Sequence, residues 1–356
     1  MRINPNTGLS RKYYLHAYRG KANHAGSKAV NDCEEIMRKL GYKELSYGLA
    51  ESNNKVIAKI QKMFSELKLF EIPYGSLLVV EHPIYIKRNY LLVLKKIKKI
   101  KKIKLAFIIH DLESIRHLLP DSDVYSKRDY QMYEIADFII AHNPAMKNYL
   151  VDKCNVEKER IIELGVFDYL AEKNVQYNRK RCKNIAIAGN LAIEKSEYIY
   201  SLINKKFSSI SLNLYGVNFD EKLCMEKNYS YKGSFDANDL PNQLEGAYGL
   251  VWDGNSLDSC LGNTGNYLKY NNPHKVSLYI AAKMPIVIWK EAALAKFVLD
   301  NKIGIAVDSL NDLDRTLDEI DDVEYQSFIE HLDIIAPKIT SGNYLKDALF
   351  HIESHE

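Results

Sequence analysis

Short apolar runs alternate with segments of helical length along the whole chain, and this alternation constrains the fold more than any other feature. The runs are four to six residues long, which suits buried strands rather than helices. In the first half they lie at residues 76–81, 104–109 and 138–141. In the second half they lie at 184–189, 211–216, 249–252, 285–289 and 304–307. Alternation of this kind predicts βαβ units and parallel sheets.

The alternation is interrupted at residues 169–183, which are polar and have no clear apolar period. We therefore predict a first domain at 1–172 and a second at 173–335. Two domains also suit a chain of 356 residues, because single domains usually have ~100–200. A C-terminal helix is expected at 336–356, set off by a break at Ala336 before Pro337. The expected fold class is α/β, with two doubly wound parallel sheets facing a cleft, where ligands bind beyond the carboxyl ends of the strands.

Composition and missing motifs exclude several classes. No apolar run reaches the ~18 residues of a membrane span, and residues 1–20 lack an apolar signal core. Five dispersed cysteines favour a reducing compartment, so we expect a cytoplasmic protein. The absence of Gly-x-Gly-x-x-Gly and P-loop motifs argues against a nicotinamide dehydrogenase or P-loop NTPase. No His-Glu-x-x-His, paired cysteine or Asp-x-Asp motif occurs, so no bound metal is expected.

Ionisable residues follow the apolar run at 104–109. His110, Asp111 and Glu113 are expected at the carboxyl edge of the sheet, where a carboxylate can take a proton from a hydroxyl nucleophile. The alternative is that Asp111 or Ser114 only caps the next helix.

A second candidate precedes the amphipathic stretch that ends at Gly41. Gly26 and Ser27 stand at its start, with Ser27 the expected N-cap and Gly41 the C-cap. A helix N-terminus that follows small residues is a natural anion site.

The most informative segment runs from residue 262 to 285. A loop rich in Gly and Asn leads into an Asn-Asn-Pro turn, and a helix is expected from about Pro273. Asn271, His274 and Lys275 would then lie near a helix N-terminus, an arrangement that suits a diphosphate. The alternative is a capped helix with an incidental lysine.

Two further turns follow strands of the second half. The Gly189-Asn190 turn allows the backbone to approach a ligand closely. The segment from Lys232 to Phe235, with Asp239-Leu240-Pro241 after it, either brackets a nucleobase or forms an ordinary turn.

The segment from Lys95 to Lys104 contains seven lysines and three isoleucines. Leu91, Leu94, Ile97, Ile100 and Ile103 recur every third residue, which predicts a helix with one apolar stripe. The lysines are either a solvated surface or a basic face that contacts anionic lipid. Nucleic-acid binding is not expected, because no aromatic platform or recognised motif accompanies them.

Several of these motifs together resemble a known group. The run at 270–282, Tyr-Asn-Asn-Pro-His-Lys followed by Tyr279 and Ala281-Ala282, resembles the signature of bacterial β-1,6-galactofuranosyltransferase-like proteins. That group includes the glucosyltransferase 3 proteins, which elongate glycans on serine-rich adhesins. The stretch from His110 to Arg116 is similar to the group's His-Asp-x-x-x-x-Arg motif. Residues 26–29 and 187–191 lie where the group has small-residue segments. The lysine and isoleucine segment is not recognised as a feature of the group.

The resemblance implies a GT-B glycosyltransferase with two Rossmann-like domains, the donor on the second and the acceptor on the first. It implies transfer of a hexose such as galactofuranose or glucose from a UDP-sugar to a hydroxyl of a growing surface polysaccharide or glycoprotein glycan. Such enzymes usually stabilise the leaving diphosphate with basic side chains and helix N-termini, without a metal or other cofactor. The donor residues would be Gly189, Asn190, Asn271, His274, Lys275 and Lys232. Gly26, Ser27 and Arg116 would serve the acceptor or phosphate side, and Asp111 would be the general base, with His110 or Glu113 as the next candidates.

Two other functions stay open at this point. One is a catalytically idle GT-B subunit that supports a partner transferase, and the other is a nucleotide-sugar epimerase or mutase. The expected partners are a UDP-sugar, a glycan acceptor that is lipid-linked or carried on protein, and an anionic membrane contacted peripherally through Lys95 to Lys104. A homo-oligomer is left open.

Overall fold

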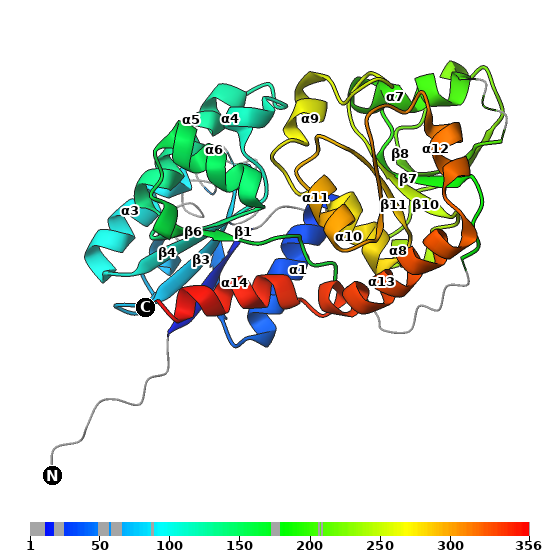
Figure 1. Cartoon of the computed structure of the whole chain (residues 1–356). Helices are drawn as coiled ribbons and strands as arrows, with labels where there is room; N and C mark the ends of the chain where they lie inside the picture. The colour runs from blue at the N-terminus through cyan, green and yellow to red at the C-terminus, as the bar shows by residue number, and fades with distance from the viewer. Residues whose placement is uncertain are drawn as a thin grey trace, which may run out of the picture.

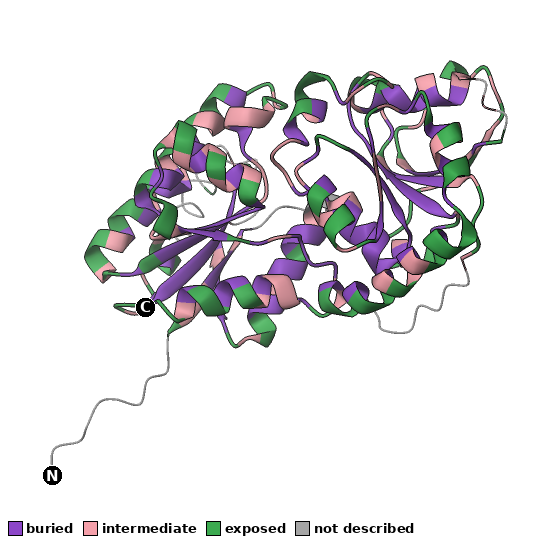
Figure 2. Ribbon diagram, in the orientation of Figure 1, coloured by how far each residue is buried: buried purple, intermediate pink, exposed green. Residues whose placement is uncertain are grey.

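A computed structural model describes residues 11–17, 25–48, 57, 66–86, 89–171, 179–205, 207 and 209–355. They form two α/β domains that lie side by side, each built on a six-stranded parallel sheet (Figure 1). The central strands are buried between helices in both domains (Figure 2). This confirms the predicted architecture. The predicted boundary, residue 172, lies outside the described residues.

The first sheet has the strand order β2-β1-β3-β4-β5-β6, and every neighbouring pair is parallel. The three predicted strands are β3 (Leu77–His82), β4 (Lys104–Ile109) and β5 (Phe138–Ala141). Three strands without a continuous apolar run complete it: β1 (Lys12–Ala17), β2 (Lys43–Tyr47) and β6 (Ile161–Glu163). They lie toward the two edges of the sheet, where burial on both faces is less complete.

The second sheet has the order β12-β11-β10-β7-β8-β9, again all parallel. All five predicted strands are present: β7 (Asn184–Asn190), β8 (Ser211–Val217), β10 (Tyr248–Val251), β11 (Ile286–Trp289) and β12 (Gly304–Val307). The sixth, β9 (Tyr229–Gly233), is a half-exposed edge strand. The chain order reverses at β7, so the carboxyl ends of β7 and β10 form the switch point where such sheets bind ligands.

Helices cover both faces of the first sheet. They are α1 (Ala25–Lys39), α3 (Tyr90–Lys101), α4 (Glu113–Arg116), α5 (Ser122–Ile135) and α6 (Pro144–Cys154), with a 3₁₀ turn at Lys158–Arg160. Because α1 begins at Ala25, Ser27 lies in its first turn and is not the predicted N-cap. Gly41 follows the end of α1 with φ +83°, as a helix-ending glycine does.

The second domain contains α7 (Ile193–Asn204), α8 (Leu240–Gln243), α9 (Gly262–Tyr267), α10 (His274–Ala281), α11 (Ala295–Asp300), α12 (Leu313–Glu319) and α13 (Asp322–Thr340), with a 3₁₀ turn at Glu221–Leu223. The chain then returns to the first domain through α14 (Asn343–Glu353). There Leu345 and Leu349 join the core between α1 and the first sheet (Figure 1).

The predicted break at Ala336 is wrong. Pro337 lies inside α13, which continues to Thr340. The chain turns instead at Gly342, which has φ +82°. A Cβ on Gly342 would lie 2.6 Å from the Ile36 side chain, so the close packing of this turn on α1 places the break.

The lysine and isoleucine segment forms α3, as predicted, but its apolar stripe is shorter. Leu91, Leu94 and Ile97 are buried, whereas Ile100 is 59% exposed. Each step of three residues turns a helix by about 300°, so the stripe drifts by about 60° per step. Ile103 is buried beyond the end of the helix. In the part of the chain that the structure describes, no helix is long and apolar enough to span a membrane.

Candidate active site

Asp111 lies directly after β4, at the carboxyl edge of the first sheet. Its Oδ2 is 2.5 Å from a guanidinium nitrogen of Arg116, and the side chain is 27% exposed. The pKa of Asp111 is raised above its usual value, because burial outweighs the lowering effect of nearby charges, among them Arg116 and Lys195. Lys195 belongs to the first turn of α7, so the second domain acts on this carboxylate. Asp111 is thus partly accessible and pairs with Arg116.

Glu113 has a different environment, although it lies only two residues further on. It is fully buried in the first turn of α4. It accepts hydrogen bonds from Arg116 Nε at 2.8 Å, the Leu118 amide at 3.2 Å and Ser122 Oγ at 3.3 Å. Tyr85 donates a further bond at 3.3 Å. These donors surround both carboxylate oxygens, so Glu113 holds the α4–α5 turn and faces no substrate.

His110 is held between two partners. Its ring stacks on Phe167 with centroids 5.3 Å apart and planes 8° from parallel. Its Nε2 lies 3.6 Å from an oxygen of Glu81 on β3. Gly26 and Ser27 lie in the first turn of α1, and Ser27 is half-buried.

Helix α9 of the second domain contacts the loop that carries Asp111 (Figure 1). The backbone N–H of Leu112 donates to the Tyr267 hydroxyl at 2.9 Å. Asn263 Nδ2 donates to the His117 carbonyl at 2.9 Å. Both residues belong to the predicted Gly- and Asn-rich segment, but sequence reasoning missed their role, because contacts across domains leave no local pattern.

A second link between the domains surrounds Asn272. Its backbone N–H donates to His142 Nδ1 at 2.9 Å, and its side-chain amide donates to the His142 carbonyl at 2.8 Å. Asn143 donates to Asn272 Oδ1 at 2.8 Å. His142 Nε2 donates to the Ile109 carbonyl at 2.8 Å, which leaves Nδ1 as the acceptor. Burial lowers the pKa of His142 to about 3, so the ring is neutral as this pattern requires.

Three neighbouring strands of the second sheet have a glycine with positive φ at or next to their last residue. Gly189 is the residue before the end of β7, with φ +139°, Gly216 is the residue before the end of β8, with φ +146°, and Gly233 ends β9 with φ +83°. A Cβ on Gly216 would lie 1.7 Å from the Gly189 carbonyl oxygen. Only glycine fits there, because the backbone of β7 packs directly against Gly216.

Lys275 lies beside Gly189, near the carboxyl end of β7. Its Nζ donates to the Trp252 carbonyl at 3.0 Å and to Asp253 Oδ1 at 2.9 Å, both just beyond β10. A Cβ on Gly189 would lie 3.5 Å from Lys275 Cε. The structure therefore brings Lys275 and Gly189 together, as a shared diphosphate site requires. Asn190 accepts hydrogen bonds from the Ala192 amide and from Asn218 Nδ2, which shape the turn.

The other residues predicted to bind the donor are buried or paired with other side chains. His274 stacks on Tyr169 with centroids 4.9 Å apart, and burial lowers the pKa of His274 to about 3. The ring is therefore neutral. Lys232 pairs with Glu245 at 2.7 Å. Asn271 Oδ1 is buried and accepts no hydrogen bond from the described residues.

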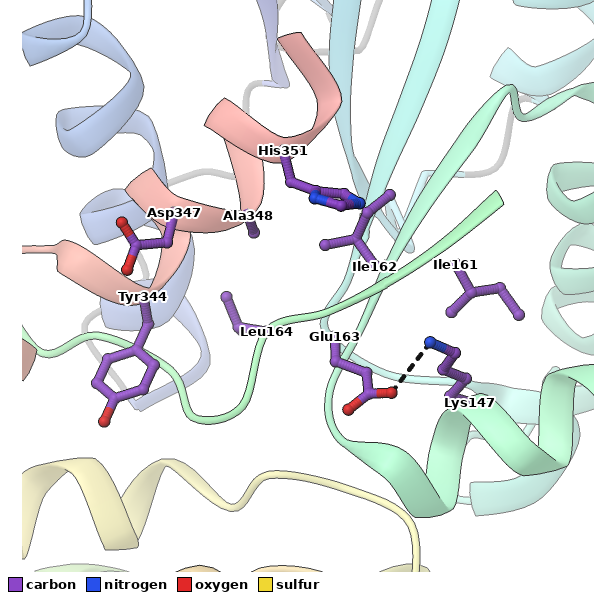
Figure 3. Close-up of a pocket in the computed structure, with 9 residues that line it drawn as sticks. All are labelled: Lys147, Ile161, Ile162, Glu163, Leu164, Tyr344, Asp347, Ala348 and His351. Carbon is purple, nitrogen blue, oxygen red and sulfur yellow. Dashed lines mark ion pairs between the residues drawn. The ribbon is translucent and has the colours of Figure 1, made fainter. Parts of the chain in front are cut away.

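A pocket of about 350 Å³ lies elsewhere, between α14 and β6 (Figure 3). Its lining includes Ile162, Asp347 and His351, and Lys147 pairs with Glu163 beside it at 3.0 Å. None of the predicted site residues lines it, so we assign it no substrate.

Comparison with known proteins agrees with this geometry. A glucosyltransferase 3-like N-terminal domain model matches residues 12–166, and the corresponding C-terminal domain model matches residues 185–352. Over 348 residues the chain is 30% identical to the β-1,6-galactofuranosyltransferase WbbI of Escherichia coli K12, covering 95% of this chain and 97% of that protein. It is 23% identical over 323 residues to glucosyltransferase 3 of Streptococcus gordonii, covering 90% and 92%.

Solved structures share the fold at low identity. An α-glucosyltransferase in complex with UDP superposes with a TM-score of 0.60 at 13% identity, covering 96% of this chain and 99% of that one. The sequence relatives and the two parallel-sheet domains support the same assignment. The chain therefore belongs to the glucosyltransferase 3-like family of glycosyltransferases, which has the GT-B fold.

Proposed function

We propose that this glycosyltransferase moves a hexose from a UDP-sugar to a hydroxyl of a growing surface polysaccharide or glycoprotein glycan. The observation that carries the proposal is the proximity of Lys275 to Gly189, near the carboxyl end of β7. The names of the relatives favour galactofuranose or glucose as the sugar.

The second domain would bind the donor. The backbone at Gly189 and the Lys275 ammonium would hold the diphosphate, and the end of β9 at Gly233 would approach the base. Lys195 in the first turn of α7 adds a further cation on the side of Asp111. These groups would stabilise the charge that develops on the leaving diphosphate, so the proposed mechanism uses no metal ion there.

The first domain would bind the acceptor, with Asp111 as the general base. Its carboxylate would take the proton from the acceptor hydroxyl as the glycosidic bond forms. Arg116 opposes the rise that burial gives the pKa of Asp111 and holds the carboxylate in place through their ion pair. We prefer Asp111 to Glu113, because the oxygens of Glu113 are occupied by donors from α4 and α5.

A donor panel tests the proposal and separates it from its alternatives. UDP, GDP and TDP sugars are compared by thermal shift, since a ligand at 100 times its Kd stabilises the folded state by about 2.7 kcal/mol. UDP release is then measured with and without an acceptor glycan. Release that requires acceptor supports a transferase, whereas binding without release indicates an idle subunit. A donor that changes without acceptor indicates an epimerase or mutase.

We also propose that α3 brings the protein to the inner face of an anionic membrane that carries lipid-linked acceptor. Lys95 and Lys98 are paired with Glu134 and Asp137 at 3.2 and 2.8 Å. Lys96, Lys99 and Lys102 are exposed, and so are Leu92 and Ile100 at 52% and 59%. Exposed apolar side chains among lysines suit a headgroup interface, where each lysine adds roughly 1 kcal/mol.

Vesicle co-sedimentation tests this proposal. Lys96→Gln with Lys99→Gln should abolish binding to anionic vesicles at low salt. The matched control is Lys290→Gln with Lys296→Gln, which removes two exposed lysines from the second domain. Wild-type protein that stays in the supernatant, or a control that loses binding equally, would contradict the proposal.

A further inference from the structure

Three side chains able to bind metal meet at one buried point of the first domain. Cys33 belongs to α1, Glu81 to β3, and His110 follows β4. The cysteine sulfur, a glutamate oxygen and an imidazole nitrogen lie within 4.8 Å of one another. Cys33 is 4% exposed and Glu81 is 2% exposed. Three donors of different chemistry are therefore gathered in a nearly dry environment.

The geometry at His110 fits an ion better than a hydrogen bond. His110 Nε2 is buried and has no hydrogen-bond partner among the described residues. The Glu81 oxygen is 3.6 Å away, beyond the ~3.2 Å limit of a good N–H···O bond. Two nitrogen or oxygen ligands at ~2.0–2.1 Å from a tetrahedral zinc ion are about 3.3–3.4 Å apart. The observed distance between His110 Nε2 and the Glu81 oxygen exceeds that spacing by only a few tenths of an ångström.

The Glu81 carboxylate supplies negative charge at this point, because it is 2% exposed and one of its oxygens lies 3.6 Å from His110 Nε2. The stacked Phe167 ring fixes the plane of His110, as a pre-organised ligand requires.

We propose that Cys33, Glu81 and His110 bind one Zn²⁺ ion, with water in the fourth position. Thiolate, imidazole and carboxylate are the ligands that zinc takes in proteins. Binding releases the Cys33 proton to solvent and leaves the thiolate, with no change of oxidation state. His110 keeps 13% of its side chain exposed, which gives the ion a path of entry.

This inference goes beyond the proposed function. The ion would tie α1 and β3 to the residue before Asp111, and it would hold the acceptor-side loop in place. It takes no part in stabilising the donor diphosphate. The sequence did not indicate a metal, because the three ligands are 48 and 29 residues apart and form no motif.

Cobalt substitution tests the site in the full chain. The purified protein is stripped with a chelator and titrated with Co²⁺, which reports its ligands by absorption. We expect one equivalent per chain, tetrahedral d–d bands in the visible and a thiolate-to-cobalt charge-transfer band in the near ultraviolet. Zn²⁺ should bleach both. Wild-type protein without the charge-transfer band overturns the proposal.

Variants assign the ligands. Cys33→Ser should abolish the charge-transfer band. The control is Cys260→Ser, which removes a buried thiol of the second domain and should keep the band. A band that persists in Cys33→Ser overturns the assignment. His110→Gln is a second variant that keeps side-chain volume, and it should weaken zinc binding by more than the roughly 10–100-fold lost with an outer-shell partner. Metal content does not depend on UDP release, so failure of either proposal leaves the other testable.

Discussion

Replacement of Lys275 by methionine should lower both activity and stability, for two different reasons. The Lys275–Asp253 ion pair is 2.9 Å long, and its side chains are 16% and 12% exposed. Methionine retains most of the volume but removes the ammonium, so the Asp253 carboxylate is left nearly buried without its counterion. A lysine beside a loop is usually replaced with little effect on folding. Here the structure predicts a loss of stability instead, because Lys275 is paired and mostly buried.

The magnitude follows from burial. Loss of one partner of a fully buried pair costs about 3–5 kcal/mol, and the remaining exposure here reduces this to about 2–3 kcal/mol. A change of 1 kcal/mol moves the melting temperature of a domain of this size by about 2–4 °C. The second domain should thus unfold about 5–10 °C lower. Loss of a pre-organised charge at the diphosphate should lower turnover by about 100- to 1,000-fold.

A double-variant cycle separates the two effects. Asp253→Asn combined with Lys275→Met removes the unpaired carboxylate, so most of the lost stability should return. Turnover should stay low, because the ammonium is still missing. Asp253→Asn alone should be less stable than wild type but should keep most of its activity. Melting temperatures and UDP release at saturating donor measure the four proteins.

Two results would refute this reasoning. Full activity of the double variant would mean that Lys275 only balances the charge of Asp253. A wild-type melting temperature for Lys275→Met would mean that the pair contributes nothing to folding.

Asp111→Asn should lower turnover by about 100-fold or more with donor binding unchanged by thermal shift, as expected for a general base; unchanged turnover would remove Asp111 from the mechanism. Glu113→Gln should mainly lower the melting temperature, since it places an amide among donors that surround a carboxylate; a larger loss of turnover than in Asp111→Asn would reverse the assignment. Tyr267→Phe removes the acceptor of the Leu112 amide, so its main effect should be a loss of turnover, with little change in melting temperature. Turnover equal to that of wild type would show that α9 does not position the Asp111 loop. His142 has a pKa of about 3 when folded and 6.5 as a free side chain, so the unfolded chain binds its proton first as the pH falls. The free energy of unfolding should therefore drop by about 1 kcal/mol more in wild type than in His142→Gln between pH 7 and 5.5. Urea titrations of the two proteins at both pH values measure this difference. An equal change in the free energy of unfolding between the two pH values would contradict the prediction. Asp168, with its pKa raised to about 7, contributes in the opposite direction, but its contribution is the same in both proteins and cancels in the comparison.

Much of the fold could be predicted from sequence, because the signals are local. A buried parallel strand such as β4 is a continuous apolar run, and a turn that needs positive φ at its end is marked by Gly189. The Asn-Pro-His-Lys segment starts a helix for the same kind of local reason. Edge strands such as β9 were missed, since partial exposure dilutes the apolar pattern.

The site was predictable as a set of segments, but the state of each side chain was not. Asp111 and Glu113 are alike in sequence, and only the packing of α4 on α5 occupies the oxygens of Glu113. His274 stacks on Tyr169, and burial lowers the pKa of His274 to about 3. Exposure, protonation and pairing depend on residues far apart in the chain, whereas strands, helices and turns depend on neighbours. Sequence alone therefore determined the architecture and where to look for the site, and the tertiary structure decided which groups are accessible and charged for the chemistry.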